Sequence, residues 1–450
     1  MIAGLLYLFI FISILPFLRR NRGKLFYFRP DIIFSLAFLI YVVPVPLNRL
    51  YFDNYYKFDD IILSDILQMQ ILFVLGFFAG FHIFTPTSRL NPPRPVFNRI
   101  SNKSISKWVL YISLIFSVIL YFIYLHKLGG IASYLSAKRL FIYKHNQGLG
   151  IYGVGILILK AVWILFIAKF LMNYYSTGHK KRIDKVRLLW FILLNLLGLI
   201  LFIVFNLAIG DRRVLLGLIV SLVGILYLYR FVSNRVIVVI GLVLLIFFQV
   251  FSKLRHLSNN PGKMIEFAKN KWQIEWLDLS SGESAGHYIV FNDILKNKEK
   301  LDKMYGLTYI KAPLIIVPKF VYPDRYQGLS YWFVNKFYPG TAKRGGGFAF
   351  SIVAEAYLNF GFLGTFFIGL IFGIIFARIW IVTMFKYKTA LSQTIYMLLL
   401  LFIITLPRAD FSAILKESTI SIFLPLAVIF VVSKALRIEG KDMVLSDSSE

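Results

Sequence analysis

The stretch that decides the fold runs from Phe348 to Phe385 and reads FAFSIVAEAYLNFGFLGTFFIGLIFGIIFARIWIVTMF. One unbroken helix over these residues would be about 57 Å long, nearly twice the roughly 30 Å hydrocarbon core of a membrane. Asn359-Phe360-Gly361 interrupts the run, because a glycine after an asparagine favours a helix end. The sequence therefore predicts a short outer-face helix within residues 348–360, running from Phe348 to about Leu358, and then a spanning helix from Gly361.

Apolar runs of spanning length recur along the whole chain. Of its 450 residues, 58% are hydrophobic and 16% are charged, whereas a soluble domain carries roughly 25% charged residues. Backbone groups inside a membrane must pair within their own segment, so helices are expected. The pattern predicts an all-α integral membrane protein with about eleven transmembrane helices. The expected spans are residues 2–18, 31–47, 61–84, 107–126, 151–174, 188–208, 213–231, 236–252, 361–383, 389–407 and 418–433.

Lysine and arginine in the short loops predict the orientation of these spans. One set of alternate loops carries 22 such residues and the other set carries 10. Cytoplasmic loops are the richer in basic residues, so we expect an outside amino terminus and a cytoplasmic carboxyl terminus. The first span has its basic residues after it, unlike a cleaved signal. The predicted divisions are residues 1–252 (eight spans), 253–347 (a large outer loop), 348–360 (the short helix), 361–433 (three spans) and 434–450 (a cytoplasmic tail).

Net charge and residue types limit the chemistry. The net charge of +28 invites a nucleic-acid interpretation, but much of the charge lies in short loops where orientation explains it, so we expect no nucleic-acid partner. The chain has no cysteine, which excludes disulfides, thiolate metal sites and a cysteine nucleophile. It also lacks a DxD motif, a phosphate-cradling loop, a zinc signature and a Gly-x-Ser-x-Gly elbow. We therefore predict no metal and no cofactor.

The short outer-face helix carries the most informative polar residues. Ser351, Glu355 and Asn359 are spaced by four, which predicts that they share one helix face. A carboxylate in apolar surroundings costs several kcal/mol unless it is paired or reaches water. Two interpretations stay open for Glu355. It pairs with an arginine and holds the bundle together, or it contacts substrate.

Charged residues also lie in two short outer turns. Asp211, Arg212 and Arg213 form one turn, and Arg408 and Asp410 lie in another. Positive charge on the outer face opposes the orientation rule, so an anionic ligand such as a lipid diphosphate is expected to balance it. Arginine suits phosphate because its planar fork binds two oxygens at once. In the alternative, the arginines of the first turn snorkel to the interface, and Arg408 pairs with Asp410.

Further candidates lie in or beside the large loop. Arg255 and His256 follow the eighth span, and Lys319 and Arg325 lie deeper in the loop. A histidine titrates near neutrality and is a candidate general base, although a lone loop histidine is usually solvated. The sequence therefore adds one candidate base and three candidate cations to the outer face.

Four motifs resemble those of a known family. GGGFAFSIVAEAYLNFGFLG (Gly345 to Gly364) resembles the signature of the oligosaccharide repeat-unit polymerases, the Wzy-type O-antigen and capsule polymerases. GDRR (Gly210 to Arg213), PKFVYPDR (Pro318 to Arg325) and PRADF (Pro407 to Phe411) are similar to outer-face motifs of the same family. The resemblance implies a GT-C-like glycosyltransferase of the bacterial inner membrane. Its substrates would be undecaprenyl-diphosphate-linked glycans at the periplasmic face, among membrane lipids, with a chain-length regulator of the polysaccharide co-polymerase type as a candidate partner.

That chemistry needs a base and fixed positive charge. A base takes the acceptor hydroxyl proton, and cations stabilise the departing diphosphate. We expect Glu355 to be the base, with His256 and Asp410 as the alternatives. The expected diphosphate and glycan ligands are Arg212, Arg213, Arg255, Arg408, Lys319, Arg325, Asp211, Ser351 and Asn359.

Two other functions stay open. An O-antigen ligase shares the architecture but passes the glycan to lipid A core. A flippase or transporter of lipid-linked oligosaccharides belongs to a different class, and its polar residues are expected around a midplane site. Here the ionisable residues gather at the outer ends of the spans, which favours chemistry at the outer face.

Overall fold

The chain is an all-helical, multi-pass integral membrane protein. The computed structural model describes residues 1–18, 26–51, 58–86, 107–127, 150–176, 198–200, 202, 212–229, 231–257, 283–318, 321–343, 346–387 and 389–446. No β-strand occurs in these ranges. They contain seven helices long and apolar enough to cross a membrane: Pro30–Tyr51, Asp60–Phe84, Trp108–Lys127, Gly155–Met172, Ile352–Tyr387, Ala390–Arg408 and Phe411–Ala435.

Four other predicted spans are not among these seven helices. The spans expected at residues 2–18, 213–231 and 236–252 fall on shorter apolar helices. The span expected at 188–208 lies almost wholly outside the described residues. The total of eleven spans therefore stays a prediction.

The chain divides into two compact units. The first unit comprises Met1–Pro92, Ser233–Phe385 and Phe402–Glu417, and the second comprises Pro93–Val232, Lys386–Leu401 and Ser418–Glu450. All the candidate site residues whose side chains are described belong to the first unit. Its helices are α1 (Ile2–Ile14), α2 (Pro30–Val42), α3 (Pro44–Tyr51), α4 (Asp60–Phe84), α11 (Asn234–Leu257), α13 (Glu283–Lys296), α14 (Leu307–Lys311), α15 (Leu329–Phe337), α16 (Pro339–Lys343), α17 (Ile352–Ile381) and α19 (Phe411–Ser418).

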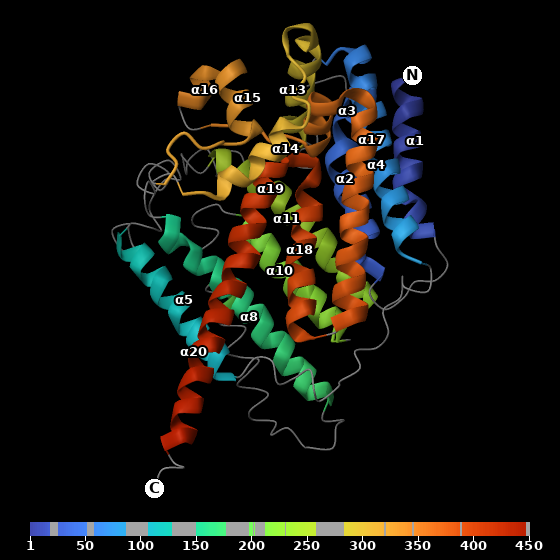
Figure 1. Ribbon diagram of the computed structural model, residues 1–450. Coiled ribbons are helices and arrows are strands. Elements are labelled where there is room, and N and C mark those ends of the chain that lie inside the picture. Colours follow the sequence, from blue (N-terminus) through green and yellow to red (C-terminus); the bar gives the residue numbers. More distant parts are fainter. Residues whose placement is uncertain are drawn as a thin grey trace. The chain divides into compact units, whose positions relative to one another are not determined.

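Helices α4 and α17 pack backbone against backbone, and Figure 1 shows them side by side. A Cβ added to Gly76 of α4 would lie 2.1 Å from the carbonyl oxygen of Phe366, and one on Gly369 of α17 would lie 2.3 Å from that of Phe73. Each glycine is repeated four residues later, at Gly80 and Gly373, with the same close approach. Small residues at this spacing let two membrane helices meet closely. The pair forms the centre of the first unit.

Aromatic side chains extend this core to α2. The Phe34 ring of α2 stacks on Phe77 of α4 with centroids 3.6 Å apart. Phe73 and Phe77 of α4 also contact Phe372 and Phe376 of α17. Aromatic pairs add a modest attraction beyond the area they bury. The three helices therefore form one packed block.

Two residues set the start of helix α17 and the break within it: Ser351 and Gly361. Ser351 caps its first turn, since the Ser351 hydroxyl accepts from the Val353 N–H at 3.2 Å. The helix thus starts at Ile352, later than the Phe348 start expected from the sequence, because the cap residue takes an extended conformation (φ −90°, ψ 142°). Gly361 interrupts the helix with φ 72° and ψ −162°, a conformation that is essentially restricted to glycine. The residues before this break carry Glu355 and Asn359.

The described part of the segment between α11 and α17 consists of four helices and the irregular stretches that connect them. It contains α13, α14, α15 and α16, joined by 3₁₀ turns at Lys298–Lys300 and Ala312–Ile316. Helix α13 packs against α2, α3 and α4, and α14 packs against α17. The buried hydroxyl of Tyr288 in α13 donates to the Val42 carbonyl of α2 at 2.8 Å. This segment is therefore fixed to the membrane helices rather than forming a separate domain.

The second unit contains α5 (Lys107–Lys127), α8 (Gly150–Ser176), α10 (Arg212–Leu228), most of α18 (Ala390–Thr405) and α20 (Leu424–Ser446). Helix α5 packs on α8, where Gly155 lies close to the Ser117 carbonyl. Two hydrogen bonds join α10 to α18: Ser221 Oγ donates to the Met397 carbonyl (3.1 Å), and Tyr229 Oη donates to Gln393 Oε1 (2.7 Å). These side-chain bonds compensate for the loss of water around polar atoms.

Candidate active site

Glu355 lies in the first turn of α17 and is completely buried, at 0% exposed. Its Oε1 accepts a hydrogen bond from the Thr308 hydroxyl of α14 (2.6 Å), and its Oε2 accepts from the Phe411 backbone N–H at the start of α19 (2.6 Å). Both donors are neutral. Among the described residues, Glu355 forms no ion pair with an arginine. The carboxylate instead joins three helices of the first unit.

Asn359 lies one turn after Glu355 on the same face and is also fully buried. Its Nδ2 donates to Thr308 Oγ1 and to the Glu355 carbonyl, both at 2.8 Å, while its Oδ1 accepts from the Gly306 N–H at 2.8 Å. Glu355, Asn359 and Thr308 therefore form one closed network. Ser351, expected on this face, instead caps the helix, because it precedes the first helical residue.

Asp410 supplies a second buried carboxylate, at 1% exposed. Its Oδ2 accepts from the Leu329 N–H of α15 and from the Ser412 hydroxyl, both at 2.7 Å. Burial raises the pKa of Asp410, and these hydrogen bonds offset part of that rise. Arg408 has different partners, so the expected Arg408–Asp410 pair is wrong in this structure.

Two tyrosines lie near the backbone that binds the carboxylates. The Tyr309 ring contacts that of Phe411, whose N–H donates to Glu355, and Tyr326 lines the cavity together with Gly328, which approaches Asp410. Burial, followed by the negative charges of Glu355 and Asp410, raises the pKa of Tyr309 and of Tyr326. Both hydroxyls are buried, and neither has a hydrogen-bond partner among the described residues. A buried donor left unpaired costs about 1–3 kcal/mol. Two carboxylates and two neutral phenols therefore meet in one place, a donor and acceptor set suited to sugar hydroxyls.

Arg408 stands beside this cluster, at the end of the turn Leu406–Arg408. Its guanidinium lies over the Tyr41 ring of α2, 5.7 Å from the centroid, and Nη1 is 3.4 Å from the Tyr41 hydroxyl. His287 of α13 is fully buried, and neither ring nitrogen has a hydrogen-bond partner among the described residues. Burial, and then the positive charge of Arg408, lowers the pKa of His287 to about 3. His287 is therefore neutral at physiological pH.

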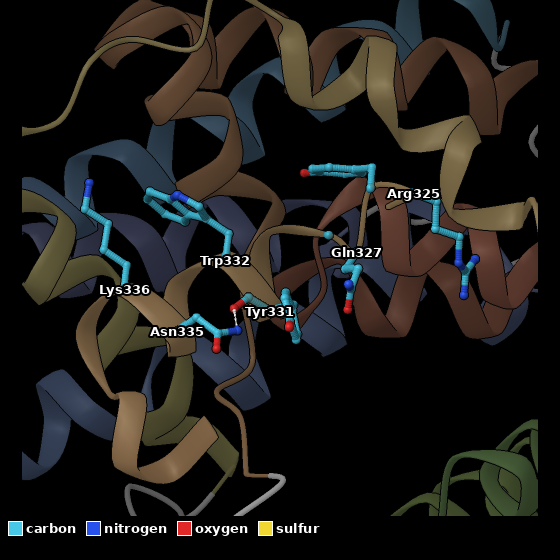
Figure 2. A pocket seen from close by; sticks show the side chains of 8 residues that line it. Arg325, Gln327, Tyr331, Trp332, Asn335 and Lys336 are labelled. Atoms are coloured by element: carbon cyan, nitrogen blue, oxygen red, sulfur yellow. Dashed lines mark hydrogen bonds between the residues drawn. The ribbon is translucent and has the colours of Figure 1, made fainter. Parts of the chain in front are cut away.

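A cavity of about 530 Å³ lies next to the backbone that binds Asp410, because Gly328 lines it and the following N–H, that of Leu329, donates to Asp410. Figure 2 shows the side chains that line this cavity. It is lined by residues of α15 and the segment before it: Arg325, Tyr326, Gln327, Gly328, Tyr331, Trp332, Asn335 and Lys336. Arg325 is the one predicted site residue among them, and it is half-buried. Its Nε is buried and lacks a hydrogen-bond partner among the described residues.

The side chains of the other predicted residues lie outside the described part of the structure. Arg212 and Arg213 begin α10 in the second unit, and Arg255 and His256 end α11, with side chains outside the described part. The loop position expected for Arg255 and His256 is wrong, because α11 continues to Leu257. Asp211 and Lys319 lie outside the described residues.

Some site residues were missed by the sequence reasoning. Thr308, Tyr309 and Tyr326 join the cluster from sequence positions about 30–100 residues away from the carboxylates that they face. No local spacing predicts such contacts. His287 could have been singled out as a lone ionisable side chain in an apolar helical pattern. No group of three or more His, Asp or Glu residues placed to hold a metal ion occurs within the described ranges.

Residues 286–437 match the family model described as O-antigen polysaccharide polymerase Wzy. The match supports the Wzy-type resemblance seen in the sequence and spans Glu355, Asn359, Asp410, Arg408 and Arg325. No curated protein and no solved structure matches the chain.

Proposed function

We propose that this chain is a polymerase that joins undecaprenyl-diphosphate-linked oligosaccharide repeat units at the periplasmic face of a bacterial inner membrane. The proposal includes eleven spans, an outside amino terminus and a GT-C-like arrangement. It also includes the large outer loop and the cytoplasmic tail set out above. A chain-length regulator of the co-polymerase type is the proposed protein partner.

The observation that carries the proposal is the setting of Glu355. Its carboxylate is buried beside Asp410, and its own hydrogen-bond partners are neutral donors. Such a group is costly to keep, since an isolated buried charge is penalised by several kcal/mol. Buried ionisable residues in membrane helices usually mark function. The match to the polymerase family covers the segment that builds this site.

In the proposed reaction the growing glycan is the donor. The acceptor sugar hydroxyl attacks the anomeric carbon of the donor, a new C–O bond forms, and the bond from that carbon to the diphosphate oxygen breaks. The hydroxyl proton passes to Glu355, and undecaprenyl diphosphate leaves with the electron pair. Thr308 donates to the same carboxylate, so substrate entry requires α14 to move away from α17.

The departing diphosphate requires positive charge. We propose that Arg408 binds the departing diphosphate, because it ends the turn two residues before Asp410. Arg325 is proposed as a ligand of the glycan, because it lines the cavity whose Gly328 approaches Asp410 Oδ2. Asp211, Arg212, Arg213, Arg255 and Lys319 are the further proposed ligands of the diphosphate or the glycan. A fixed guanidinium stabilises charge as it develops in the transition state.

The deciding experiment is polymerisation by the purified full chain in proteoliposomes. The substrate is undecaprenyl-diphosphate-linked repeat units extracted from the host. We expect Glu355→Gln to lower the rate per folded molecule by about 10²–10⁴-fold, the usual contribution of a general base. Glutamine keeps the size of the side chain and can accept the Phe411 hydrogen bond, so the folded yield should be retained.

Glu299→Gln is the matched control, because Glu299 is an exposed carboxylate of the same unit. Its rate should equal that of the wild type. A Glu355→Gln rate close to wild type would remove Glu355 from the chemistry and leave Asp410 or His256 as the base. Transfer of single units to lipid A core, with no oligomer ladder, would instead identify a ligase.

A further inference from the structure

The cavity beside Asp410 has the composition of a sugar-binding site. Tyr326, Tyr331 and Trp332 supply aromatic rings, and Gln327 and Asn335 supply amides. Its volume of about 530 Å³ falls within the roughly 300–1,000 Å³ of small-molecule sites. The C–H groups of a pyranose face carry partial positive charge and pack on the electron-rich face of an aromatic ring. Amide side chains can donate to and accept from sugar hydroxyls at the same time.

The charges of the cavity favour a sugar over a diphosphate. In Figure 2, Arg325 and Lys336 lie at opposite ends of the group of labelled side chains. The Lys336 ammonium lies over the Trp332 ring, 5.5 Å from its centroid. A compact diphosphate needs cations that converge on one point. Here the ring faces occupy the middle and the cations flank them.

The cavity is joined directly to the carboxylate cluster. Gly328 lines the cavity, and the next residue, Leu329, donates its N–H to Asp410 Oδ2 at 2.7 Å. A Cβ on Gly328 would lie 3.0 Å from the same oxygen, so the backbone there follows the carboxylate closely. Tyr326 lines the cavity, and the negative charges of Glu355 and Asp410 help to raise the pKa of its hydroxyl. A glycan in the cavity would therefore lie beside the backbone that binds Asp410.

We propose that this cavity, lined by α15 and residues 325–328, binds sugar rings of the glycan substrate, with Trp332 as the stacking platform. The choice of a glycan rests on the proposed polymerase function. The site positions the glycan and takes no part in proton transfer. It therefore acts on substrate binding rather than on the chemical step.

The test uses two probes on the purified full chain in nanodiscs. The first probe is the water-soluble oligosaccharide released by mild acid from host lipid-linked repeat units, and the second is undecaprenyl diphosphate without sugar. We expect Trp332→Ala to weaken binding of the oligosaccharide by about tenfold or more, as for a buried aromatic contact, and to leave the second probe unchanged. Trp332→Tyr, which keeps an aromatic face, should restore most of the binding.

Kinetics on lipid-linked units give an independent readout. Trp332→Ala should raise KM with kcat nearly unchanged, because a remote binding contact is lost. Tyr322→Ala is the matched control, an exposed tyrosine of the same segment outside the cavity lining, and it should behave as wild type in both assays.

Three outcomes separate the hypotheses. Oligosaccharide binding that survives in Trp332→Ala would overturn the sugar site even if the wild type polymerises. Binding that is lost in Trp332→Ala, by a chain that forms no polymer, would keep the sugar site and reject the polymerase function. A third outcome would assign the cavity to the membrane interface. In it, Trp332→Ala binds the oligosaccharide as the wild type does, and brominated lipids quench the part of the wild-type fluorescence that Trp332→Ala lacks.

Discussion

Two of the buried carboxylates of the first unit, Asp31 and Glu355, have different surroundings. Asp31 of α2 is 0% exposed and forms an ion pair with Arg29, with His82 of α4 at 3.6 Å. Glu355 of α17 is equally buried, but its partners are a hydroxyl and a backbone N–H. The Arg29 guanidinium neutralises the buried charge of Asp31, so an ion pair within the protein accounts for this carboxylate. The hydrogen-bond partners of Glu355 carry no positive charge that would neutralise its carboxylate. An uncompensated buried carboxylate is expected of a residue that reacts with substrate.

The largest expected effect comes from breaking the paired carboxylate. Asp31→Asn leaves Arg29 buried without its counter-ion, which should lower the free energy of unfolding by about 3–5 kcal/mol. Denaturation of the purified protein in mild detergent measures this loss. Polymerisation per folded molecule should be unchanged, in contrast with Glu355→Gln.

Asp60→Asn is the control for that variant. Asp60 pairs with Arg49 at 3.1 Å, but the two side chains are 61% and 37% exposed. Exposed pairs contribute about 0–1 kcal/mol, so the stability should barely change. An equal loss for Asp31→Asn and Asp60→Asn would show that burial does not distinguish these pairs.

A smaller effect is expected at the hydroxyl that contacts Glu355. Thr308→Val keeps the shape of the side chain but removes the donor to Glu355 and the acceptor for Asn359. We expect a loss of about 1–3 kcal/mol, because the Glu355 carboxyl and the Asn359 amide each lose a buried hydrogen-bond partner. Thr308→Ser should retain most of the stability, as measured by the same denaturation. A Thr308→Val protein as stable as wild type would mean that the network contributes nothing to folding.

The smallest effect concerns pH and the uncharged histidine, His287. Its folded pKa of about 3 lies below the unfolded value of about 6.5, so between these limits the unfolded chain binds more protons. Stability from this residue is therefore complete above about pH 6.5 and falls as the pH drops toward 3. At pH 5.5 the protein should be about 1.4 kcal/mol less stable than at pH 7.5.

His287→Gln cannot titrate, so its stability should change less over the same interval. Denaturation midpoints at pH 5.5 and pH 7.5 for the two proteins test this. If the wild type and His287→Gln lose the same stability on acidification, another group causes the loss.

Sequence patterns predicted the membrane class and part of the site for identifiable reasons. Apolar runs of spanning length, and the four-residue spacing of Glu355 and Asn359, are local properties that a helix converts directly into structure. Thr308, Tyr309 and Tyr326 meet those residues only through tertiary packing, so no local pattern contained them. Ser351 was misplaced because a cap residue and a residue on the helix face have the same spacing in sequence. The end of α11 was misplaced because basic residues suit a helix carboxyl terminus as well as a loop.

The glycine contact between α4 and α17 has a consequence for the time course of biosynthesis. Gly76 and the Phe366 carbonyl that it meets are about 290 residues apart. At about 5–20 residues per second, the ribosome needs about 15–60 s to make the partner of α4 after α4 itself. During that interval the glycine surface of α4 has no α17 backbone against it. The central helix pair is therefore completed late in synthesis, and a chain that stops before α17 lacks the surface on which its first unit is built.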